Sequence, residues 1–306
     1  MKSDKIRISE KYDPANGYNL IYNDVFSILS NIEDASIDHC ITDPPYNISG
    51  YDGKKAIGWL KSNKLWTEKK NFQKIDEKWD KFSDDDYKNF TLAWLSEVMR
   101  ITKPNGNLII FGTYHNIYKI GEILQSNNRK VINSIVWYKR NAFPNITQRM
   151  LCESTEHIVW AVNETVQKAK NWTFNYKELK EINSSKFCNK CKKALDFNFS
   201  NCPYCASQTL LVKNNQMRNV WEINSTPTNE KQHGKHPSQK PIGVIKRLIT
   251  GWTKKGDVII DPFMGSGTVP VVAKSMDRKF IGIDNQKEYC ELALKRLEEL
   301  QQDLLI

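Results

Sequence analysis

Short apolar runs that alternate with longer amphipathic stretches constrain the fold of this chain more than any other feature. Residues 19–22, 39–42 and 107–111 are short, largely apolar runs and are predicted to be buried strands. Residues 84–102 carry apolar side chains at helical spacing, and the stretch Lys103 to Gly106 (KPNG) ends that helix. Strands that alternate with helices in this way predict an α/β fold with a mostly parallel sheet covered on both faces.

The same alternation continues to the end of the chain. Further strands are predicted over 131–138, 156–162, 257–260 and 279–283. Further helices are predicted over 25–31, 118–126, 242–252, 268–276 and 286–300. Because sheets of this kind bind ligands at the carboxyl ends of their strands, functional residues are expected directly after strands.

Two segments break the alternation. Residues 48–82 contain few apolar residues and many Lys, Gly and Asp, and are predicted to form a long loop or a mobile lid. Residues 163–236 are polar and rich in Asn and Lys. Between 163 and 240 there are 13 basic and 6 acidic residues, an excess of +7 in a chain whose formal net charge is +10. Such an excess indicates a polyanionic partner, with nucleic acid as the first candidate.

Composition excludes two broad classes of protein. Apolar residues make up 40% of the chain and aromatic residues 11%, which excludes a wholly disordered protein. No apolar run approaches the roughly 18 residues that a membrane-spanning helix needs. The first residues are charged and lack an apolar core, so no secretory signal is expected and the protein is predicted to be cytoplasmic. In a reducing cytoplasm the seven cysteines are not expected to form a disulfide framework.

The sharpest motif is Asp43-Pro44-Pro45-Tyr46, directly after the strand predicted over 39–42. The two prolines fix the backbone angles and remove two N–H donors, so carbonyl groups and the Asp43 carboxylate remain as acceptors. Such a rigid set of acceptors suits a planar amine, with the Tyr46 ring stacked on the attached heterocycle. The alternative interpretation is a plain Asp-Pro-Pro turn.

A second motif, DPFMGSGT from Asp261 to Thr268, lies between a predicted strand and a predicted helix. Gly265 and Gly267 let the backbone approach a ligand closely at a helix N-terminus, but no Gly-Lys-Ser/Thr follows as in a phosphate-binding loop. About 20 residues on, Asp284 ends the next strand, where it is placed to accept from ribose hydroxyls. Either half alone would also fit a Gly-rich turn with a capping Asp.

Four cysteines in the polar segment form two CxxC pairs separated by ten residues: Cys188, Cys191, Cys202 and Cys205. This spacing predicts a tetrahedral zinc site with four thiolate ligands, while the reducing compartment disfavours disulfides, the alternative. Because cysteine fills every position, the zinc is expected to be structural and to stabilise a ribbon over about 186–208.

The surroundings of this ribbon leave two interpretations open. Four lysines are placed to contact phosphates: Lys186, Lys190, Lys192 and Lys193. The alternative is a zinc-stapled insert that faces solvent or a partner subunit. The other cysteines, Cys40, Cys152 and Cys290, are predicted to be buried small apolar residues.

These motifs together resemble those of the S-adenosylmethionine-dependent DNA amino-methyltransferases of restriction–modification systems. DPPY is similar to the catalytic motif of that family, and DPFMGSGT followed by FIGID, which ends at Asp284, to its cofactor motif. DPPY precedes the cofactor motif by more than 200 residues, the circularly permuted order of the beta group. His236 to Pro241 (HPSQKP) is similar to that group's HPTQKP stretch. The resemblance extends from Tyr18 to about Leu300, apart from the cysteine insert.

The resemblance implies a Rossmann-like methyltransferase fold in three parts. Residues 1–162 are expected to form the catalytic half, 163–235 the target-recognition region with the ribbon, and 236–306 the cofactor-binding half. The implied partner is duplex DNA with its target base flipped out, because a stacked base cannot reach a strand-end pocket. A homodimer and a separately acting restriction endonuclease are also conceivable, and no membrane partner is expected.

The catalytic residues expected from the motif are Asp43, Pro44, Pro45 and Tyr46. Hydrogen bonds from the target amine to Asp43 and to the Pro44 carbonyl favour a pyramidal nitrogen, whose lone pair can then attack the sulfonium methyl group. Tyr46 is expected to stack on the flipped base. DPPY rather than SPPY favours adenine N6 over cytosine N4.

The cofactor, S-adenosylmethionine, is expected to contact Asp43 and residues of the second motif: Asp261, Phe263, Gly265, Ser266, Gly267, Thr268 and, at the ribose, Asp284. Asp24 is predicted either to approach the adenine ring or to cap a helix. Ser238 and Lys240 are predicted either to touch the methionine carboxylate or to cap the helix that begins at 242.

The sequence is also compatible with other functions. They are cytosine-N4 methylation on the same scaffold, methylation of RNA or of a protein amide, and a zinc-containing DNA-binding protein without activity. The presence of Asp43, Tyr46 and the glycine loop argues against the last of these, because an inactive scaffold need not keep all of them.

Overall fold

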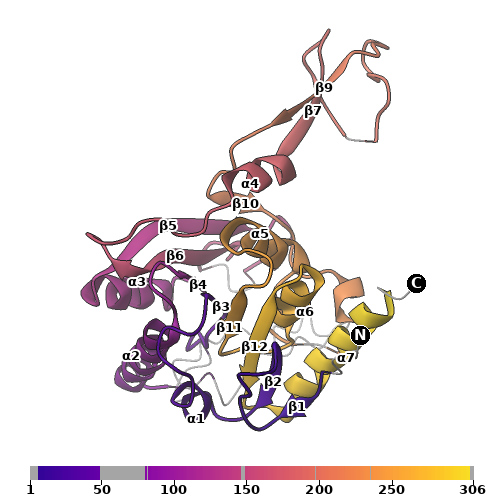
Figure 1. The fold of residues 1–306 in the computed structure, drawn as a ribbon. Helices are drawn as coiled ribbons and strands as arrows, with labels where there is room; N and C mark the ends of the chain where they lie inside the picture. The colour runs from indigo at the N-terminus through magenta and orange to yellow at the C-terminus, as the bar shows by residue number, and fades with distance from the viewer. Residues whose placement is uncertain are drawn as a thin grey trace.

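The computed structural model describes residues 6–48, 80, 82–145, 149–196, 198–234 and 236–303. The loop or lid predicted over 48–82 therefore lies almost wholly outside the described residues. Within these ranges the body of the molecule is built on a nine-stranded sheet in the order β1-β2-β12-β11-β3-β4-β6-β5-β10 (Figure 1). Its strands are β1 (Ile8–Ser9), β2 (Tyr18–Tyr22), β3 (His39–Thr42), β4 (Asn107–Gly112), β5 (Arg129–Tyr138), β6 (Thr155–Thr165), β10 (Val220–Glu222), β11 (Val258–Asp261) and β12 (Lys279–Asp284).

The sheet is mostly parallel, as predicted, and β6 is the exception. It pairs in antiparallel fashion with both β4 and β5, whereas the other neighbours pair in parallel. The carboxyl ends of β2, β12, β11, β3, β4 and β5 consequently lie along one edge of the sheet. Because β6 runs the other way, its first residues reach that same edge.

Strands from the C-terminal part of the chain lie between strands from the N-terminal part. β11 and β12 separate β2 from β3, with Ile259 opposite His39 and Phe280 opposite Tyr18. This order places the residues that follow β3 beside the residues that follow β11. The two predicted motifs, more than 200 residues apart in the sequence, therefore meet at neighbouring strand ends.

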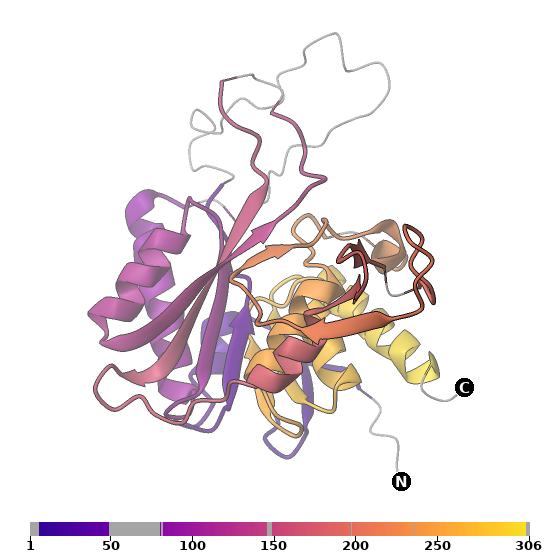
Figure 2. The ribbon, with the colours of Figure 1, turned by 90° about the horizontal axis from the view of Figure 1, so that it is seen from above.

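Helices cover both faces of the sheet (Figure 2). One face packs against α1 (Val25–Leu29), α2 (Asp84–Ile101) and α3 (Ile117–Ser126), and the other against α4 (Tyr176–Ile182), α5 (Ile242–Trp252), α6 (Thr268–Ser275) and α7 (Lys287–Asp303). In β4, Leu108 and Ile110 belong to the first core, while Ile109 and Phe111 belong to the second. Burial on both faces explains why this strand is a continuous apolar run.

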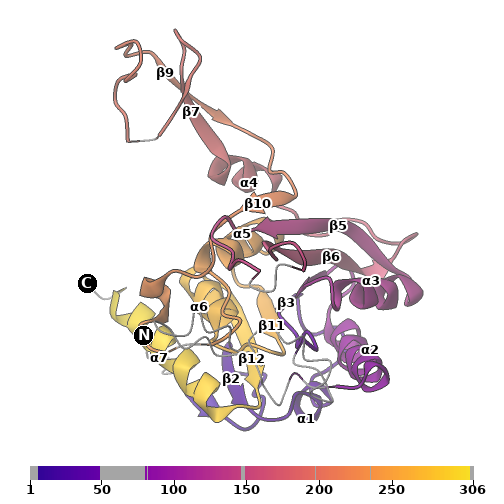
Figure 3. The same cartoon turned by 180° about the vertical axis from the view of Figure 1, so that it is seen from behind.

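A second, three-stranded sheet stands apart from the body. β7 (Ser184–Cys188) pairs in antiparallel fashion with β8 (Ala194–Leu195) and β9 (Leu210–Asn214), and this ribbon projects beyond the β10 edge of the main sheet (Figures 1 and 3). The elements on either side, α4 and β10, belong to the body, since α4 packs on α5 and β10 pairs with β5. The projecting part, 184–214, is therefore shorter than the recognition region expected over 163–235.

One prediction about the isolated cysteines is wrong. Cys40 and Cys290 are buried as expected, but Cys152 is exposed. It lies in the irregular segment between β5 and β6, where its Sγ donates to the carbonyl of Phe143 at 3.0 Å. Connecting segments run over the surface, so a cysteine there need not pack into a core. In the described part of the chain, none of the helices combines the length and the apolar character needed to cross a bilayer.

Candidate functional site

A cavity of about 280 Å³ opens at the carboxyl edge of the parallel strands and joins the predicted motifs. Among its lining residues are most of the predicted site residues: Asp24, Asp43, Pro44, Pro45, Tyr46, Ser238, Lys240, Asp261, Phe263, Gly265, Ser266, Thr268 and Asp284. Gly267 is not among the lining residues. The sheet order thus brings predicted residues from five separate stretches of the chain to one cavity.

At one end of the cavity the DPPY turn is held in place from two sides. The Tyr87 hydroxyl, on α2, donates to the Pro45 carbonyl at 2.7 Å. The buried carboxylate of Asp80 accepts from the backbone N–H groups of Asn47 and Ile48, at 2.6 and 2.9 Å. Neither support has a sequence signal, because both come from segments that are distant in the chain. They fix the turn that carries the catalytic candidates.

Both carboxylate oxygens of Asp43 accept hydrogen bonds from other side chains. Its Oδ1 accepts from the Tyr46 hydroxyl, and its Oδ2 forms an ion pair with the Lys240 ammonium. Lys240 also donates to the Ser238 carbonyl at 3.1 Å, and its Nζ lies 5.4 Å from the centre of the Tyr46 ring. The lysine of the HPSQKP stretch therefore faces the Asp43 carboxylate.

Sequence reasoning missed a second carboxylate behind this pair. Glu156, on β6, lies with its Oε2 3.3 Å from the Tyr46 hydroxyl and 3.4 Å from Lys240 Nζ. Its Oε1 forms an ion pair of 3.0 Å with Lys139, which follows β5. No motif marks Glu156, because it reaches this edge only through the antiparallel direction of β6. The side chains of Lys139 and Glu156 are largely buried, at 14% and 15% exposed.

The charges in this cluster shift one another's pKa values. Burial raises the pKa of Asp43, and the Lys240 ammonium only partly opposes that increase. Burial also acts to raise the pKa of Glu156, but Lys240 and Lys139 outweigh it and hold that pKa below the usual value. Burial acts to lower the pKa of Lys240, and Asp43 and Glu156 reverse this and raise it. Lys240 and Glu156 are therefore both charged at neutral pH.

Two further carboxyl groups line the cavity where β11 and β12 end. Asp261 accepts from the Thr42 hydroxyl at 2.7 Å and from the Phe263 N–H at 3.2 Å. Burial, with the nearby carboxyls of Asp43 and Asp284, raises its pKa to about 7. Asp284 accepts from the N–H groups of Gly265 and Gln286, and burial raises its pKa to about 6. Carboxyl groups whose pKa values are raised in this way favour a cationic ligand. Its positive charge offsets the cost of ionising them while they are buried and close together.

The two glycines of the loop are required by backbone shape and by close packing. Gly265 and Gly267 have φ values of 49° and 72°, in the left-handed region. A Cβ on Gly265 would lie 2.9 Å from His236 Nε2, and one on Gly267 would lie 2.5 Å from the Cβ of Ala293 on α7. Gly267 thus serves the contact between the loop and α7, whereas Gly265 makes room for His236 beside the cavity.

Two of the open alternatives concern helix caps. The Asp24 carboxylate caps α1, accepting from the N–H groups of Phe26 and Ser27 at 3.0 and 3.2 Å, and it also borders the cavity. Neither Ser238 nor Lys240 caps α5, whose first N–H, of Ile242, donates to Glu230 at 2.9 Å. The capping interpretation is confirmed for Asp24 and is wrong for the other two.

The lining residues fit a ligand that is part nucleoside and part amino acid. Val25, Phe263 and Ile283 supply apolar walls for a planar ring, and Asp284 supplies an acceptor for hydroxyl groups. Asp261 supplies a carboxyl group, and Gly265 leaves room for close approach. S-adenosylmethionine, with an adenosine part and two cationic centres, has this chemistry.

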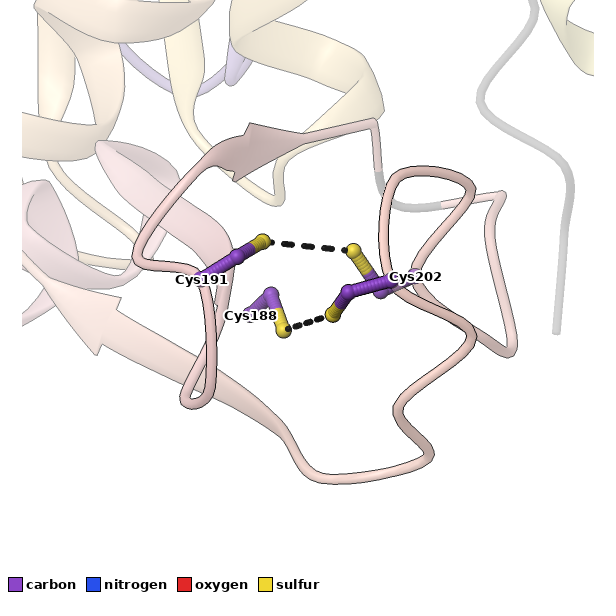
Figure 4. A group of neighbouring side chains, drawn as sticks. Cys188, Cys191 and Cys202 are labelled. Atoms are coloured by element: carbon purple, nitrogen blue, oxygen red, sulfur yellow. Dashed lines mark hydrogen bonds between the residues drawn. The ribbon is translucent and has the colours of Figure 1, made fainter.

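A separate constellation lies at the tip of the ribbon, where the predicted zinc ligands come together. The ligand atoms of Cys188, Cys191, Cys202 and Cys205 all lie within 4.8 Å of one another. Cys188 Sγ is 3.5 Å from Cys205 Sγ, and Cys191 Sγ is 3.6 Å from Cys202 Sγ. Figure 4 shows Cys188, Cys191 and Cys202 pointing toward a common centre. Zn–S bonds of about 2.3 Å in a tetrahedron require sulfur atoms roughly 3.8 Å apart, close to these distances.

The two CxxC turns have the same backbone form. The N–H of Lys192 donates to the Cys188 carbonyl, and the N–H of Ala206 donates to the Cys202 carbonyl, each at 2.9 Å. Lys192 and Ala206 each stand four residues after the first cysteine of a pair, with φ values of 60° and 54°. The N–H groups of Cys191 and Lys190 lower the pKa of the Cys188 thiol. Paired turns of this kind present four sulfur atoms inward from a short stretch of chain.

Comparison with known proteins finds relatives over nearly the whole length. A DNA methylase family matches residues 37–295. The chain is 36% identical to the type II methyltransferase M2.DpnII of Streptococcus pneumoniae, covering 96% of this chain and 94% of that protein. It is 31% identical to the type II methyltransferase M2.MboI of Moraxella bovis, covering 92% of this chain and 88% of that protein.

Solved structures share the same arrangement of strands and helices. The M1.HpyAVI–SAM complex is 27% identical in sequence and superposes with a TM-score of 0.56, covering 90% of this chain and 97% of that one. The cytosine-N4-specific PvuII DNA methyltransferase superposes with a TM-score of 0.60 at 15% identity, covering 92% of this chain and 89% of that one. At that identity the second likeness concerns the fold alone.

Proposed function

The chain belongs to the DNA methylase family, and from this premise we propose that it methylates N6 of adenine in DNA. Membership in the family confirms the expected S-adenosylmethionine-dependent DNA methyltransferase, and the structural likeness confirms the expected fold. The proposal concerns the target atom and the residues that act on it. The observation that supports it most is the position of Asp43. This residue directly follows β3 and lines the same cavity as Asp261 and Asp284.

The chain's own residues would act on the amino group as acceptors. When bound, S-adenosylmethionine supplies an electrophilic methyl group on a sulfonium. Asp43 and the Pro44 carbonyl accept the two amino hydrogens, which favours a pyramidal nitrogen with an available lone pair. The nitrogen would take the methyl group from bound S-adenosylmethionine, which would leave as its neutral thioether. The nitrogen, then cationic, would lose one proton, and Asp43, whose pKa is raised by burial, is the proposed acceptor of that proton.

Tyr46 is proposed to stack on the flipped base, and Lys240 to hold Asp43 in place. Tyr46 is 8% exposed in the structure, so its ring face becomes available only when the target base displaces neighbouring groups. Ser238, which borders the cavity beside His236, is proposed to contact the cofactor together with Asp24 and the Asp261 loop. Gly267 contributes by holding that loop against α7.

A methyl-transfer assay tests the target. The protein is incubated with tritiated S-adenosylmethionine and with DNA, RNA or protein as acceptor, and labelled DNA is digested to nucleosides. Label in N6-methyldeoxyadenosine supports the proposal, whereas label in N4-methyldeoxycytidine, or only in RNA or protein, contradicts it. Single-molecule sequencing of DNA from a host that makes the protein reports the base and its sequence context together.

We also propose that the four cysteines of the ribbon hold a structural zinc ion. The distances between their sulfur atoms, and the presence of four thiols as the whole ligand set of the cluster, support a closed site with four thiolate ligands. The ribbon is small, and the metal would supply folding free energy that its core lacks. Metal analysis of the purified protein should find one zinc per chain. A protein with no zinc, purified without chelators, would contradict this.

The partners follow from the proposed reaction. Duplex DNA with one flipped nucleotide is the proposed substrate, and the basic ribbon is proposed to contact its phosphates. Type II methyltransferases among the relatives support a role as the modification enzyme of a restriction–modification system, with a separately acting endonuclease. The two type II relatives named above come from bacteria, and we propose that the enzyme acts in the bacterial cytoplasm with its DNA. Sedimentation with and without DNA tests whether it acts as a homodimer.

A further inference from the structure

Both carboxylate oxygens of Asp43 are occupied in the structure, although the proposed reaction needs this carboxylate to accept from the target amine. The Tyr46 hydroxyl occupies Oδ1, and the Lys240 ammonium occupies Oδ2. The entering amino group must therefore displace at least one of these donors. A buried ammonium without a partner is costly, so the displaced group needs another acceptor within reach.

Glu156 is within reach of both displaced donors. One atom, Oε2, lies 3.3 Å from the Tyr46 hydroxyl and 3.4 Å from Lys240 Nζ, so a shift of a few tenths of an ångström turns either distance into a full hydrogen bond. The other atom, Oε1, is anchored by Lys139 at 3.0 Å. β6 holds the glutamate rigidly, because Glu156 sits in the β5–β6 ladder opposite Trp137.

We propose that Glu156 is a positioning residue that takes over Lys240 and Tyr46 from Asp43 when the target amine enters. This inference rests on the proposed methyl transfer and adds a second carboxylate to it. Glu156 does not line the cavity, so it would act through the two donors rather than on the substrate. The low pKa of Glu156 keeps it ionised at neutral pH, as an acceptor of an ammonium group must be.

The charge balance explains why a carboxylate is needed at this place. Lys139 and Lys240 face Asp43 and Glu156, two cations against two carboxyl groups. Replacing Glu156 with Gln removes one negative charge, so Lys240 has Asp43 as its only ionic partner in the cluster. Lys240 then holds Asp43 more strongly, and displacement by a neutral amine becomes less favourable.

The test is single-turnover methyl transfer by Glu156→Gln, on the DNA that the wild type methylates. The rate is expected to fall by roughly 10- to 100-fold, in line with coupling within one ionic network. The thermal midpoint is expected to fall, because Lys139 loses its carboxylate partner, whereas the affinity for S-adenosylmethionine, which reports on an intact cavity, is expected to stay close to the wild type. In the Lys240→Met background the same substitution should cost only a few-fold, because the ammonium that it affects is gone.

Three results would overturn the inference. They are a wild-type rate for Glu156→Gln, an equal loss in both backgrounds, and a loss that merely follows weaker cofactor binding. If Glu156→Gln fails to fold, Glu156→Asp takes its place, because the shorter side chain keeps the charge but moves it away from Lys240. A wild-type rate for Glu156→Asp would also overturn the inference. Failure of the proposed function is distinct, since the wild type itself would then transfer no methyl group to DNA.

Discussion

The cavity and the ribbon are both small constellations of reactive side chains, yet the chain builds them in opposite ways. The four cysteines of the ribbon lie within 18 consecutive residues, Cys188 to Cys205, and two similar turns orient them. The cavity draws Asp43, Lys240 and Asp261 from three separate strand ends or loops, and Glu156 reaches Lys240 from a fourth. A local constellation depends on its own short stretch of chain and, in the ribbon, on the proposed zinc ion, whereas a distributed one depends on the whole sheet. Damage to one should therefore leave the other intact.

The strongest test of that independence removes a zinc ligand. Cys202→Ser should abolish zinc binding and unfold the ribbon, because structural zinc in small sites supplies roughly 10 kcal/mol or more. Metal analysis and limited proteolysis within 184–214 would show both losses. Cys40→Ser, a substitution in the body, is the matched control and should retain zinc. Loss of S-adenosylmethionine binding together with zinc would show that the two regions are coupled.

The next largest effect is expected at Asp43, the proposed catalytic carboxylate. Asp43→Ala should lower methyl transfer by about a thousandfold or more, since it removes the acceptor that prepares the nitrogen. Cofactor affinity, measured by calorimetry, should remain within a few-fold, and zinc content should not change. An Asp43→Ala enzyme with near wild-type methylation would remove the basis for the proposed mechanism.

The packing of the cavity can be probed at glycine. Gly267→Ala should destabilise the protein by about 1–3 kcal/mol, because it forces a Cβ into a left-handed conformation and against Ala293. At Gly121, within α3, an added Cβ would meet no atom within 4 Å, so Gly121→Ala should instead stabilise by about 0.5–1 kcal/mol. Thermal and chemical unfolding measure both. Equal effects of the two substitutions would contradict the packing described for the loop.

A pH dependence of cofactor binding is expected as well, and it leaves the fold unchanged. Because the pKa of Asp261 is raised to about 7 in the folded protein, its contribution to stability is present at low pH and is lost as the pH rises through 7. A cationic ligand favours the ionised form, so affinity for S-adenosylmethionine should increase by about tenfold from pH 6 to pH 8. Calorimetry across that range checks this, and Asp261→Asn should flatten the profile. If the affinity for S-adenosylmethionine instead falls from pH 6 to pH 8, ionised Asp261 does not favour the cofactor.

Much of the body could be predicted from periodicity and turn chemistry. The helix predicted over 84–102 is α2 at Asp84–Ile101, and the strand predicted over 39–42 is β3. Such features depend on neighbours in the chain: apolar spacing, a Ser83 cap and the Lys103 to Gly106 stop. The spacing of the ribbon cysteines is equally local. The sequence could not reveal Glu156, because an isolated glutamate on a strand carries no pattern.

By itself, then, the sequence determined most strands and helices of the body, the DPPY and glycine-loop motifs, and the clustering of four cysteines, but none of the elements between 176 and 222. The tertiary structure alone decided that β11 and β12 lie between β2 and β3, that β6 runs antiparallel, and that Cys152 is exposed. It also decided that Lys240 faces Asp43 and Glu156. The physical reason is the sequence separation of the residues that interact. Local propensities depend on adjacent residues, whereas strand order and the desolvation of a charged cluster depend on which distant segments are buried together.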